Sequence, residues 1–383
     1  MAHVVDPTFV NTLARYGAAD MKSCFNCGNC TAVCSLTENG ATFPRKFIRY
    51  AQLGMADRIA SSKEMWLCYY CGDCSATCPR QAEPGEFVAA ARWYIISQYD
   101  PTRLARLLYT SKTSAFIFLA AAALILALVV LRGFGSMPTD ALRLGAFINV
   151  EYIHYTGQAV IVIAGVIALL SLLNMVWRLN QSLHTANAAS NESTSDEPPT
   201  SSPWQRLTSA FYEVIAQTRF DKCATQSTPW YLSRRFVHLS IMWGFLGLLA
   251  ATGLDLLFKQ PYAHVPLYYP MRMLGTLSGL FVLYGTTSAL VNRFAKKDKY
   301  YAHSGMSDWL FLGLLWIVTI TGFVVEITVY LPSGSIPAYM VFLVHIVLAM
   351  MLVLLLPFTK FAHAVLRPVA LFIHEFKGKS SNA

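Results

Sequence analysis

Long apolar runs dominate the chain after residue 113, whereas residues 1–105 mix polar and apolar positions as a soluble domain does. About 20 helical residues are needed to cross a hydrocarbon core of ~30 Å. Backbone groups in lipid have no water to bond, so these runs must be helical. The sequence predicts six membrane spans, over residues 114–131, 153–177, 236–258, 273–291, 309–330 and 339–361.

Basic residues are concentrated in the segments that alternating spans place on one side of the membrane. Residues 178–235, residues 292–306 and the C-terminal segment are rich in Lys and Arg, whereas the opposite loops hold few. Cytoplasmic loops carry this excess, so we expect a multi-pass protein of the cytoplasmic membrane with both termini in the cytoplasm. The composition agrees, because 55% of the residues are hydrophobic and only 13% are charged. The net charge of +9 then reflects the loops, and we expect no nucleic-acid partner.

Two cysteine runs within residues 24–78 share the spacing C-x2-C-x2-C-x3-C. Pro79 follows the second run, as in the bacterial iron–sulfur pattern, and Ser35 stands at that place after the first. Zinc sites usually pair two C-x2-C knuckles and need no further thiolate three residues later. Disulfides require an oxidising compartment, and residues 1–20 are polar and mixed, unlike a signal peptide. The spacing therefore predicts two [4Fe–4S] clusters.

The cysteine runs resemble those of two-cluster ferredoxins, in which the fourth cysteine of each run ligates the other cluster. Residues 44–55 have the clearest helical pattern, and strand signals are weak throughout residues 1–105. We therefore expect an α-helical ferredoxin-type domain rather than a small β-hairpin ferredoxin. The resemblance implies one cluster on Cys24, Cys27, Cys30 and Cys78, and a second on Cys68, Cys71, Cys74 and Cys34.

Four histidines lie within or at the ends of predicted spans: His154, His238, His345 and His363. Imidazole in a membrane is costly without a partner, so each is a candidate for function. The alternative for each is a hydrogen bond to a neighbouring helix. His345 and His363 are 18 positions apart, which is five turns of one continuous helix and about 27 Å along its axis. Pro357 lies between them and can kink that helix.

This spacing matches two stacked b haems, one in each leaflet, that share a ligand helix. Each haem needs a second axial ligand at the same depth. On the cytoplasmic side His238 begins the third span and pairs with His363, and on the outer side His154 begins the second span and pairs with His345. We predict two b haems on these pairs, or one if the outer pair fails.

The order of parts resembles a fusion of the C and E subunits of heterodisulfide reductase, as in the C-subunit family of the quinone-interacting membrane-bound oxidoreductase complex of sulfate reducers. The cysteine motifs carry the first half of this resemblance. The stretch FVHLSIMWGFLG over residues 236–247, with His345 and His363, carries the second half. That half is similar to the nitrate reductase gamma family, which holds two b haems. The gamma family has a further histidine where this chain has Leu248.

The resemblance implies an all-α protein, in which an α-helical ferredoxin-type domain precedes a six-helix transmembrane cytochrome b bundle. It implies electron transfer between menaquinone and a cytoplasmic flavoprotein similar to the A subunit of heterodisulfide reductase, with adenylylsulfate (APS) reductase served during dissimilatory sulfate reduction. The expected regions are residues 1–105 (clusters), 106–180 (two spans), 181–230 (partly disordered linker), 231–365 (four spans) and 366–383 (tail).

Quinol oxidation releases protons, and two carboxylates, Asp255 and Glu326, sit at membrane depth on the outer side. They are proton-accepting candidates, or else they lie in the interface and only look buried. His303 is a solvated loop residue, a substitute for His238 or part of a quinone pocket. Two other functions stay open: an electron-transfer subunit of a heterodisulfide reductase-like or sulfite-reductase-associated complex, and a haem-free membrane anchor for the ferredoxin domain.

Overall fold

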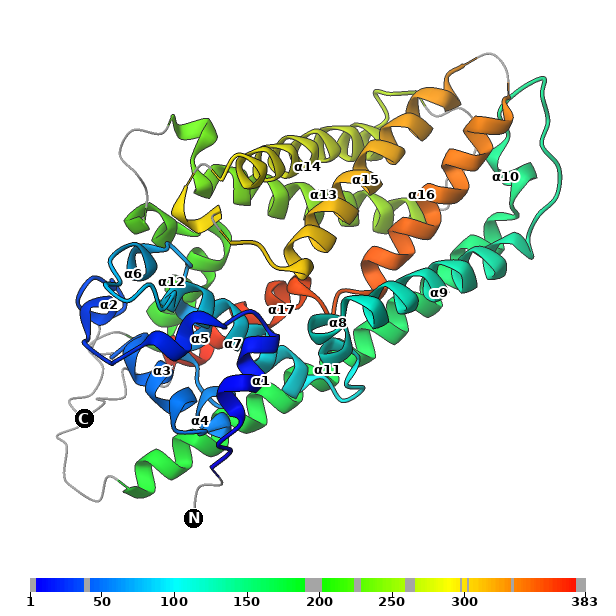
Figure 1. The fold of residues 1–383 in the computed structure, drawn as a ribbon. Helices are drawn as coiled ribbons and strands as arrows, with labels where there is room; N and C mark the ends of the chain where they lie inside the picture. The colour runs from blue at the N-terminus through cyan, green and yellow to red at the C-terminus, as the bar shows by residue number, and fades with distance from the viewer. Residues whose placement is uncertain are drawn as a thin grey trace.

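The computed structural model is helical, and the residues that it describes form no β-strand (Figure 1). Phe134 and Ile148 make an isolated bridge. The all-α class predicted from the sequence is confirmed. The described residues are 5–37, 42–189, 202–223, 229–258, 266–296, 298–301, 303–331 and 334–376, with the backbone alone for 182–189, 222–223, 255–258 and 300.

The N-terminal domain is built from short helices around α7 (Pro84–Tyr99). Phe87, Ala91 and Ile95 of α7 are fully buried, and every other α-helix of the domain except α2 packs on α7. Helix α3 fulfils the helical pattern seen around residues 44–55. The other elements are α1 (Phe9–Arg15), η1 (Asp20–Ser23), α2 (Asn29–Ala32), α3 (Arg45–Gln52), α4 (Ala56–Ala60), α5 (Glu64–Leu67), α6 (Asp73–Ala76) and α8 (Leu104–Thr110).

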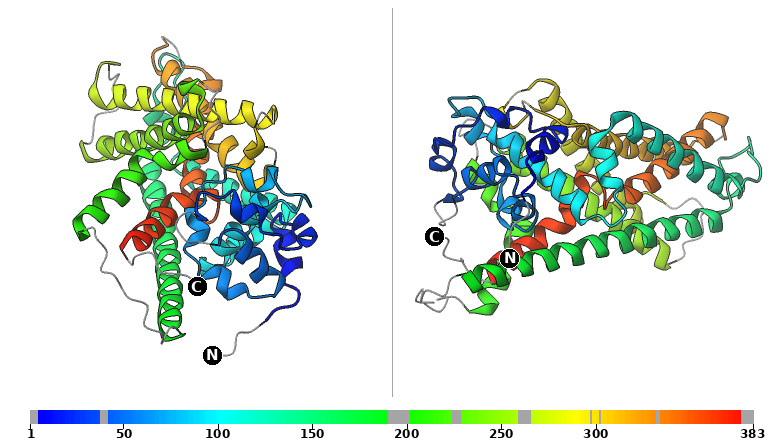
Figure 2. Two further views of the ribbon diagram at one scale, coloured as in Figure 1. Left: turned by 90° about the vertical axis from the view of Figure 1, so that its left-hand side faces the viewer. Right: turned by 60° about the horizontal axis from the view of Figure 1, so that its bottom comes forward.

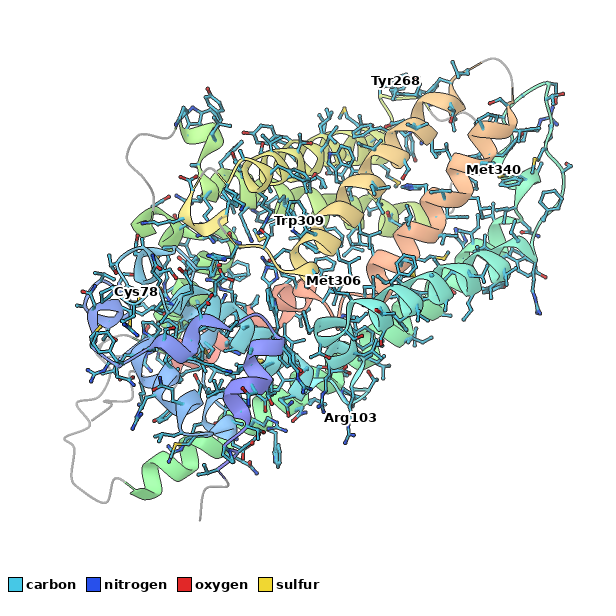
Figure 3. The ribbon with its side chains drawn as sticks, viewed as in Figure 1. Cys78, Arg103, Tyr268, Met306, Trp309 and Met340 are labelled. Atoms are coloured by element: carbon cyan, nitrogen blue, oxygen red, sulfur yellow. The ribbon has the colours of Figure 1, made fainter. Side chains whose placement is uncertain are left out.

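Six helices are long and apolar enough to cross a membrane, and they form one bundle beside the N-terminal domain (Figure 1). Figure 3 shows Met306 and Trp309 at the end of the bundle near the N-terminal domain, called the proximal end here, and Tyr268 and Met340 at the distal end. The six helices are α9 (Lys112–Leu131), α11 (Val150–Ala189), α13 (Arg234–Phe258), α14 (Pro270–Phe294), α15 (Met306–Val329) and α16 (Ile336–Leu354), with α10 (Leu144–Phe147) at the distal end.

Large apolar side chains cover the outward faces of this bundle. Phe116 on α9 is 71% exposed, and Val162 and Leu173 on α11 are also exposed. Water would make such a continuous apolar surface unfavourable, whereas lipid tails solvate it well. The exposed faces therefore support a membrane protein.

Glycines allow α13 and α14 to pack closely. A Cβ added to Gly244 would lie 2.8 Å from the Ser278 carbonyl oxygen, and one added to Gly285 would lie 2.9 Å from the Val237 carbonyl oxygen. Small residues at such contacts let two membrane helices approach backbone to backbone. This packing fixes the position of His238, which lies one residue after Val237.

Helix α11 is longer than the second predicted span. Its 40 residues extend about 60 Å, and the right-hand view of Figure 2 shows it running along the bundle and beneath the N-terminal domain. Asn174 donates hydrogen bonds to the carbonyl oxygens of Gln98 (3.2 Å) and Tyr99 (3.1 Å) at the end of α7. Residues 181–189, predicted as part of a disordered linker, continue this helix, and residues 190–201 lie outside the described residues.

The sixth predicted span is wrong in one respect. Helix α16 ends at Leu354, and His363 begins a separate helix, α17 (His363–Phe376), after the short η6 (Lys360–Ala362). Pro357 has no N–H to continue the hydrogen-bond ladder, which explains the break. His345 and His363 therefore do not share one helix face.

Two shorter helices, α12 (Pro203–Ala216) and α17, lie in the segments expected to be a linker and a tail. They pack on each other, and α17 also packs on α5 of the N-terminal domain. Leu366 and Ala370 of α17 are buried. Most of the segment predicted as a tail thus forms part of the junction between the domain and the bundle.

Candidate functional site

The two cysteine loops have the same backbone shape. Asn26 (φ 62°) and Gly28 (φ 91°) in the first loop match Tyr70 (φ 56°) and Gly72 (φ 84°) in the second. These left-handed residues flank the middle cysteine of each loop, and they turn the chain so that successive thiols face the same side. The repeated spacing in the sequence thus becomes a repeated fold.

The thiols gather in two groups. Cys24, Cys27 and Cys78 are among the cysteines within electrostatic range of Cys30. Cys68 and Cys71 are within range of Cys34. The neighbours of Cys74 include Cys68, Cys71 and Cys34, and also Cys30, so the two groups lie near each other. This arrangement agrees with the ligand sets implied by the ferredoxin resemblance, which remain a prediction.

The surroundings of the thiols suit metal-bound thiolates. Burial raises the pKa of the Cys34 thiol to about 11 and also raises the pKa of Cys74, and such thiols ionise when a metal binds them. Backbone N–H groups donate to the sulfurs of Cys68 (3.3 Å, from Tyr70) and Cys78 (3.4 Å, from Ala82). Among the described residues, no three Cys, His, Asp or Glu side chains converge on a site for a single metal ion.

The first cysteine loop faces outward. Cys27 is exposed, and the neighbouring Phe25 is among the exposed large apolar side chains. Figure 3 shows Cys78, which belongs to the same thiol group, on the side of the N-terminal domain away from the bundle. This group is therefore the one open to a partner protein.

The second cysteine loop faces the bundle. Lys299, in η5 (Lys299–Tyr301) between α14 and α15, forms an ion pair with Asp73. Three arginines from different helices also hold residues 68–70. Arg92 donates to the Cys68 carbonyl oxygen, Arg234 donates to the Tyr70 carbonyl oxygen (2.7 Å), and the Arg367 guanidinium lies over the Tyr69 ring (3.8 Å).

His238 and His363 come together beside this loop, as predicted for the proximal pair. Their ring centroids are 6.2 Å apart. Two metal–imidazole bonds of about 2 Å each, plus roughly 1 Å from each nitrogen to its ring centre, place the centroids of a bis-histidine pair about 6 Å apart. His363 Nδ1 bonds to the Lys360 carbonyl oxygen, which leaves Nε2 for a ligand and fixes the ring.

A chain of aromatic rings joins the second cysteine loop to this histidine pair. Tyr69 contacts Phe220 with centroids 4.7 Å apart, and Phe220 contacts His238 at 5.3 Å. Phe220 belongs to η3 (Thr218–Cys223), and Glu213 of α12 accepts hydrogen bonds from the Tyr69 hydroxyl and from Thr218 (2.6 Å). The polar contacts of α12 thus hold the rings in line.

Buried polar atoms near the histidine pair have no partner among the described residues. They are Nδ1 of His238 and Nε and Nη2 of Arg367. Burial lowers the pKa of Arg367 to about 10, so this side chain keeps its charge at neutral pH. A buried guanidinium with open donors is costly unless an anion meets it. Haem carries two propionate carboxylates, so this cationic pocket beside two imidazoles with ring centroids 6.2 Å apart fits a b haem.

Of the pair predicted on the outer side, His345 contacts a neighbouring helix. His345 Nδ1 lies 3.1 Å from Thr321 Oγ1 and 3.1 Å from the Val318 carbonyl oxygen, so it faces α15. His154 lies on α11, in the first turns of that helix. Leu248, at the place of the missing histidine, packs in an apolar cluster with Leu352. A haem on His154 and His345 remains a prediction.

The two predicted carboxylates differ in what the structure describes. Glu326 accepts a hydrogen bond from Thr276 (2.7 Å) and lies 3.9 Å from Arg272 Nε, near the distal end of α14 and α15. Glu326 is thus a paired, partly buried carboxylate. The Asp255 side chain lies outside the described residues.

Comparison with known families agrees with this division of the chain. Residues 103–383 match the model of citrate utilization protein B. The chain belongs to the citrate utilization protein B family. Residues 23–83 match a 4Fe-4S dicluster domain, so this family member carries iron–sulfur clusters in its N-terminal domain. No solved structure matches the chain.

Curated relatives match about a quarter of this citrate utilization protein B family member. The C subunit of the H(2):CoB-CoM heterodisulfide,ferredoxin reductase of Methanothermobacter thermautotrophicus is 32% identical over 88 residues, which is 23% of this chain and 48% of the relative. The C2 subunit of the H(2)/formate:CoB-CoM heterodisulfide,ferredoxin reductase of Methanococcus maripaludis is 33% identical over 99 residues (24% and 53%). The iron–sulfur C subunit of the CoB--CoM heterodisulfide reductase of Methanopyrus kandleri is 30% identical over 92 residues (24% and 46%).

The chain spans about half the length of these curated relatives. The likeness to the C subunit of heterodisulfide reductase supports an electron-transfer subunit of an oxidoreductase that works with other subunits. It covers about a quarter of this chain.

Several residues that join the N-terminal domain to the bundle in this citrate utilization protein B family member were not predicted from the sequence. Arg367 had a signal, since it follows His363 by four residues and so shares its helix face. Arg234 lies in the basic segment 178–235, and nothing in the sequence distinguishes it from the other cations there. Phe220 and Glu213 gave no signal, because they meet Tyr69 from a segment that begins more than 130 residues later.

Proposed function

We propose that this protein transfers electrons between membrane menaquinone and a cytoplasmic partner, through a b haem and two [4Fe–4S] clusters. The observation that carries the proposal is the ring contact series from Tyr69 through Phe220 to His238 and His363. It links the cluster domain to the closely spaced histidine pair at the proximal end of the bundle. A protein that only anchored the domain would not need this pair.

His238 and His363 would be the axial ligands of the haem, and Arg367 would bind a propionate. Arg234, which also lies over the Phe220 ring at 5.0 Å, adds positive charge to the same pocket. When bound, the haem and the clusters supply one-electron redox chemistry. The chain itself supplies the imidazoles, the compensating cations and an apolar wall that excludes water from the pocket.

The orientation of the loops suggests an order. Cys34, Cys68, Cys71 and Cys74 would hold the cluster beside the haem, because their loop contacts the bundle. Cys24, Cys27, Cys30 and Cys78 would hold the cluster nearer the surface, where Cys27 and Phe25 are exposed. In this scheme a partner protein docks at the first loop.

The proximal end would face the cytoplasm in the cytoplasmic membrane, with both termini on that side. The excess of Lys and Arg in residues 178–235 and 292–306 supports this orientation. The distal end would then face outward, where His154 and His345 are candidates for a second haem and Glu326 and Asp255 for proton transfer. Glu326 has partners that would hold it in place there.

The partners are inferred from the relatives. The resemblance to heterodisulfide reductase implies a flavin- and iron–sulfur-containing partner similar to the A subunit of that enzyme, and the C-subunit relatives support membership of a multi-subunit complex. Supply of electrons to APS reductase in dissimilatory sulfate reduction follows from the resemblance to the quinone-interacting complex. One alternative is that the protein serves a heterodisulfide reductase-like or sulfite-reductase-associated complex. Another, suggested by the name of the family, is that its partner takes part in citrate utilisation.

A haem assay on the purified protein tests the proposal. We expect haem b in a pyridine haemochrome assay, and loss of it in His238→Ala and in His363→Ala. One haem per chain would remove the His154 and His345 pair. Iron–sulfur clusters without any haem would leave the haem-free anchor as the function.

A further inference from the structure

A cavity of about 400 Å³ lies at the proximal end of the bundle, apart from the histidine pair. It is formed where the ends of α14 and α15 meet α7 of the N-terminal domain, near Trp309 in Figure 3. Binding sites for small molecules typically measure about 300–1,000 Å³. The polar residues in its wall include Glu86, Arg293, His303 and Ser304, and the aromatic ones are Trp93, Tyr301 and Trp309.

Arg293, a hydrogen-bond donor in the cavity wall, is held by neighbouring side chains. Arg293 Nη1 donates to Ser304 Oγ (2.7 Å), and the Arg293 guanidinium lies 5.7 Å from the Tyr301 ring centroid. Arg293 Nε is buried and has no partner among the described residues. Two groups that exchange protons, Glu86 and His303, belong to the same cavity. Glu86 accepts a hydrogen bond from the Tyr70 hydroxyl, in the second cysteine loop.

The cavity also adjoins that cysteine loop and the membrane edge. Gly85, next to Glu86, is so close to the loop that an added Cβ would lie 3.9 Å from the Cys74 sulfur. On the other side, the exposed Phe294 packs on Trp309 with ring centroids 4.7 Å apart, at the ends of two membrane helices. A ligand in this cavity would therefore have lipid on one side and the second cysteine loop on the other.

We propose that this cavity binds the headgroup of a quinone and is a second, cytoplasmic-side place where quinone reacts. The inference rests on the proposed function for its redox partner. A quinone needs donors for its two carbonyl oxygens, flat rings beside its own ring and a lipid-facing exit for its tail, and the wall supplies all three. The wall also holds two cations, Arg293 and Lys296. A lipid phosphate still fits less well, because the Glu86 carboxylate and the nearby Glu83 carboxylate, 3.7 Å from His303, oppose an anion, and a phosphate makes no use of the three aromatic rings.

In quinol oxidation at this site, each proton and each electron has an acceptor. When a quinol is oxidised, its two O–H bonds break, Glu86 and His303 take the two protons, and the two electrons leave one at a time to the cluster that the second cysteine loop would hold. Burial raises the pKa of Glu86 to about 7, so its carboxylate can take up and release a proton near neutral pH. The protons would be exchanged with the cytoplasm and not with the outer side.

Binding and reduction measurements on the full protein in lipid nanodiscs test this site. The probes are menadione, a naphthoquinone without a tail, for equilibrium binding, and menadiol for reduction of the bound cofactors. Losing one hydrogen bond of about 1.4 kcal/mol weakens binding roughly tenfold. We expect His303→Leu and Glu86→Leu, which remove the polar groups, each to weaken menadione binding by about this factor and to slow reduction by menadiol, while the exposed distal variant Asp140→Asn changes neither.

The outcomes separate this inference from the proposed function. Unchanged menadione binding in both His303→Leu and Glu86→Leu overturns the cavity as a quinone site. Weaker binding in Glu326→Gln would then point to the distal end instead. A different result would refute only the proposed function. If the wild-type protein binds menadione through His303, but its cofactors are reduced by dithionite and never by menadiol, then the cavity is a quinone site and quinone-linked electron transfer is wrong. Absence of menadione binding in the wild-type protein also overturns the inference.

Discussion

Removal of the Asp308 carboxylate charge should destabilise the junction more than removal of any surface charge. The side chain of Asp308 is only 7% exposed. It forms an ion pair with Lys360, lies 3.8 Å from Arg293 and accepts a hydrogen bond from the Gly305 N–H (3.0 Å). Asp308 thus joins the start of α15 to the end of α14 and to η6, just before His363.

The magnitude follows from what Asp308→Asn leaves behind. Asparagine keeps the size of the side chain and can still accept from Gly305, but it leaves the cations of Arg293 and Lys360 without their anion. Loss of one partner from a buried pair costs about 3–5 kcal/mol. Lys360 is 38% exposed and can turn to solvent, so we expect the lower part of this range, about 3 kcal/mol.

The assay is thermal unfolding of the purified protein in detergent, followed by far-ultraviolet circular dichroism. A loss of about 3 kcal/mol should lower Tm by roughly 6 °C or more. The matched control is Asp140→Asn, which breaks an ion pair with Arg143 in which the side chains are 64% and 62% exposed. Such a pair contributes about 0–1 kcal/mol. Adding Lys360→Met to Asp308→Asn should recover part of the loss, since it removes one unpaired cation. Equal shifts for Asp308→Asn and Asp140→Asn would refute the reasoning.

Three further predictions address the clusters, the helix packing and the pH response. Cys74→Ser should lose one cluster, and with it about half of the iron and the electron paramagnetic resonance signal of that cluster. Cys223→Ser, a control outside both cysteine runs, should keep all of the iron. Equal iron contents in the two variants would contradict the ligand assignment. Gly285→Ala places a Cβ 2.9 Å from a backbone carbonyl oxygen, while Gly313→Ala meets nothing within 4 Å, so only the first should lower Tm, by an equivalent of about 1–3 kcal/mol. The pKa of Glu86 is raised by burial to about 7, so between its unfolded pKa of about 4.3 and pH 7 the folded state binds more protons than the unfolded one. The free energy of unfolding should therefore fall as pH rises through this window and level off above it. If Glu86→Gln shows the same dependence of unfolding free energy on pH, then other groups cause it.

Two predictions about the histidines show what a local sequence pattern can and cannot predict. Depth in the membrane alone pairs His238 with His363, and the rings do lie 6.2 Å apart. The continuous helix expected from His345 to His363 is wrong, because the chain leaves the helix after Leu354 and starts α17 at His363. Sequence spacing predicts a helix face only while the helix continues, and Pro357 ends it.

The sequence by itself determined the parts of this protein: the helical class, the six apolar helices and the two repeated cysteine loops. Each of these depends on residues that are near one another in the chain, through hydrophobic periodicity, length or ligand spacing. Only the tertiary structure decided that the second cysteine loop faces the bundle, that Tyr69 and Phe220 line up with His238, and that Arg367 is buried beside them. These contacts join segments far apart in sequence, and their energy comes from burial and charge pairing that no local pattern records.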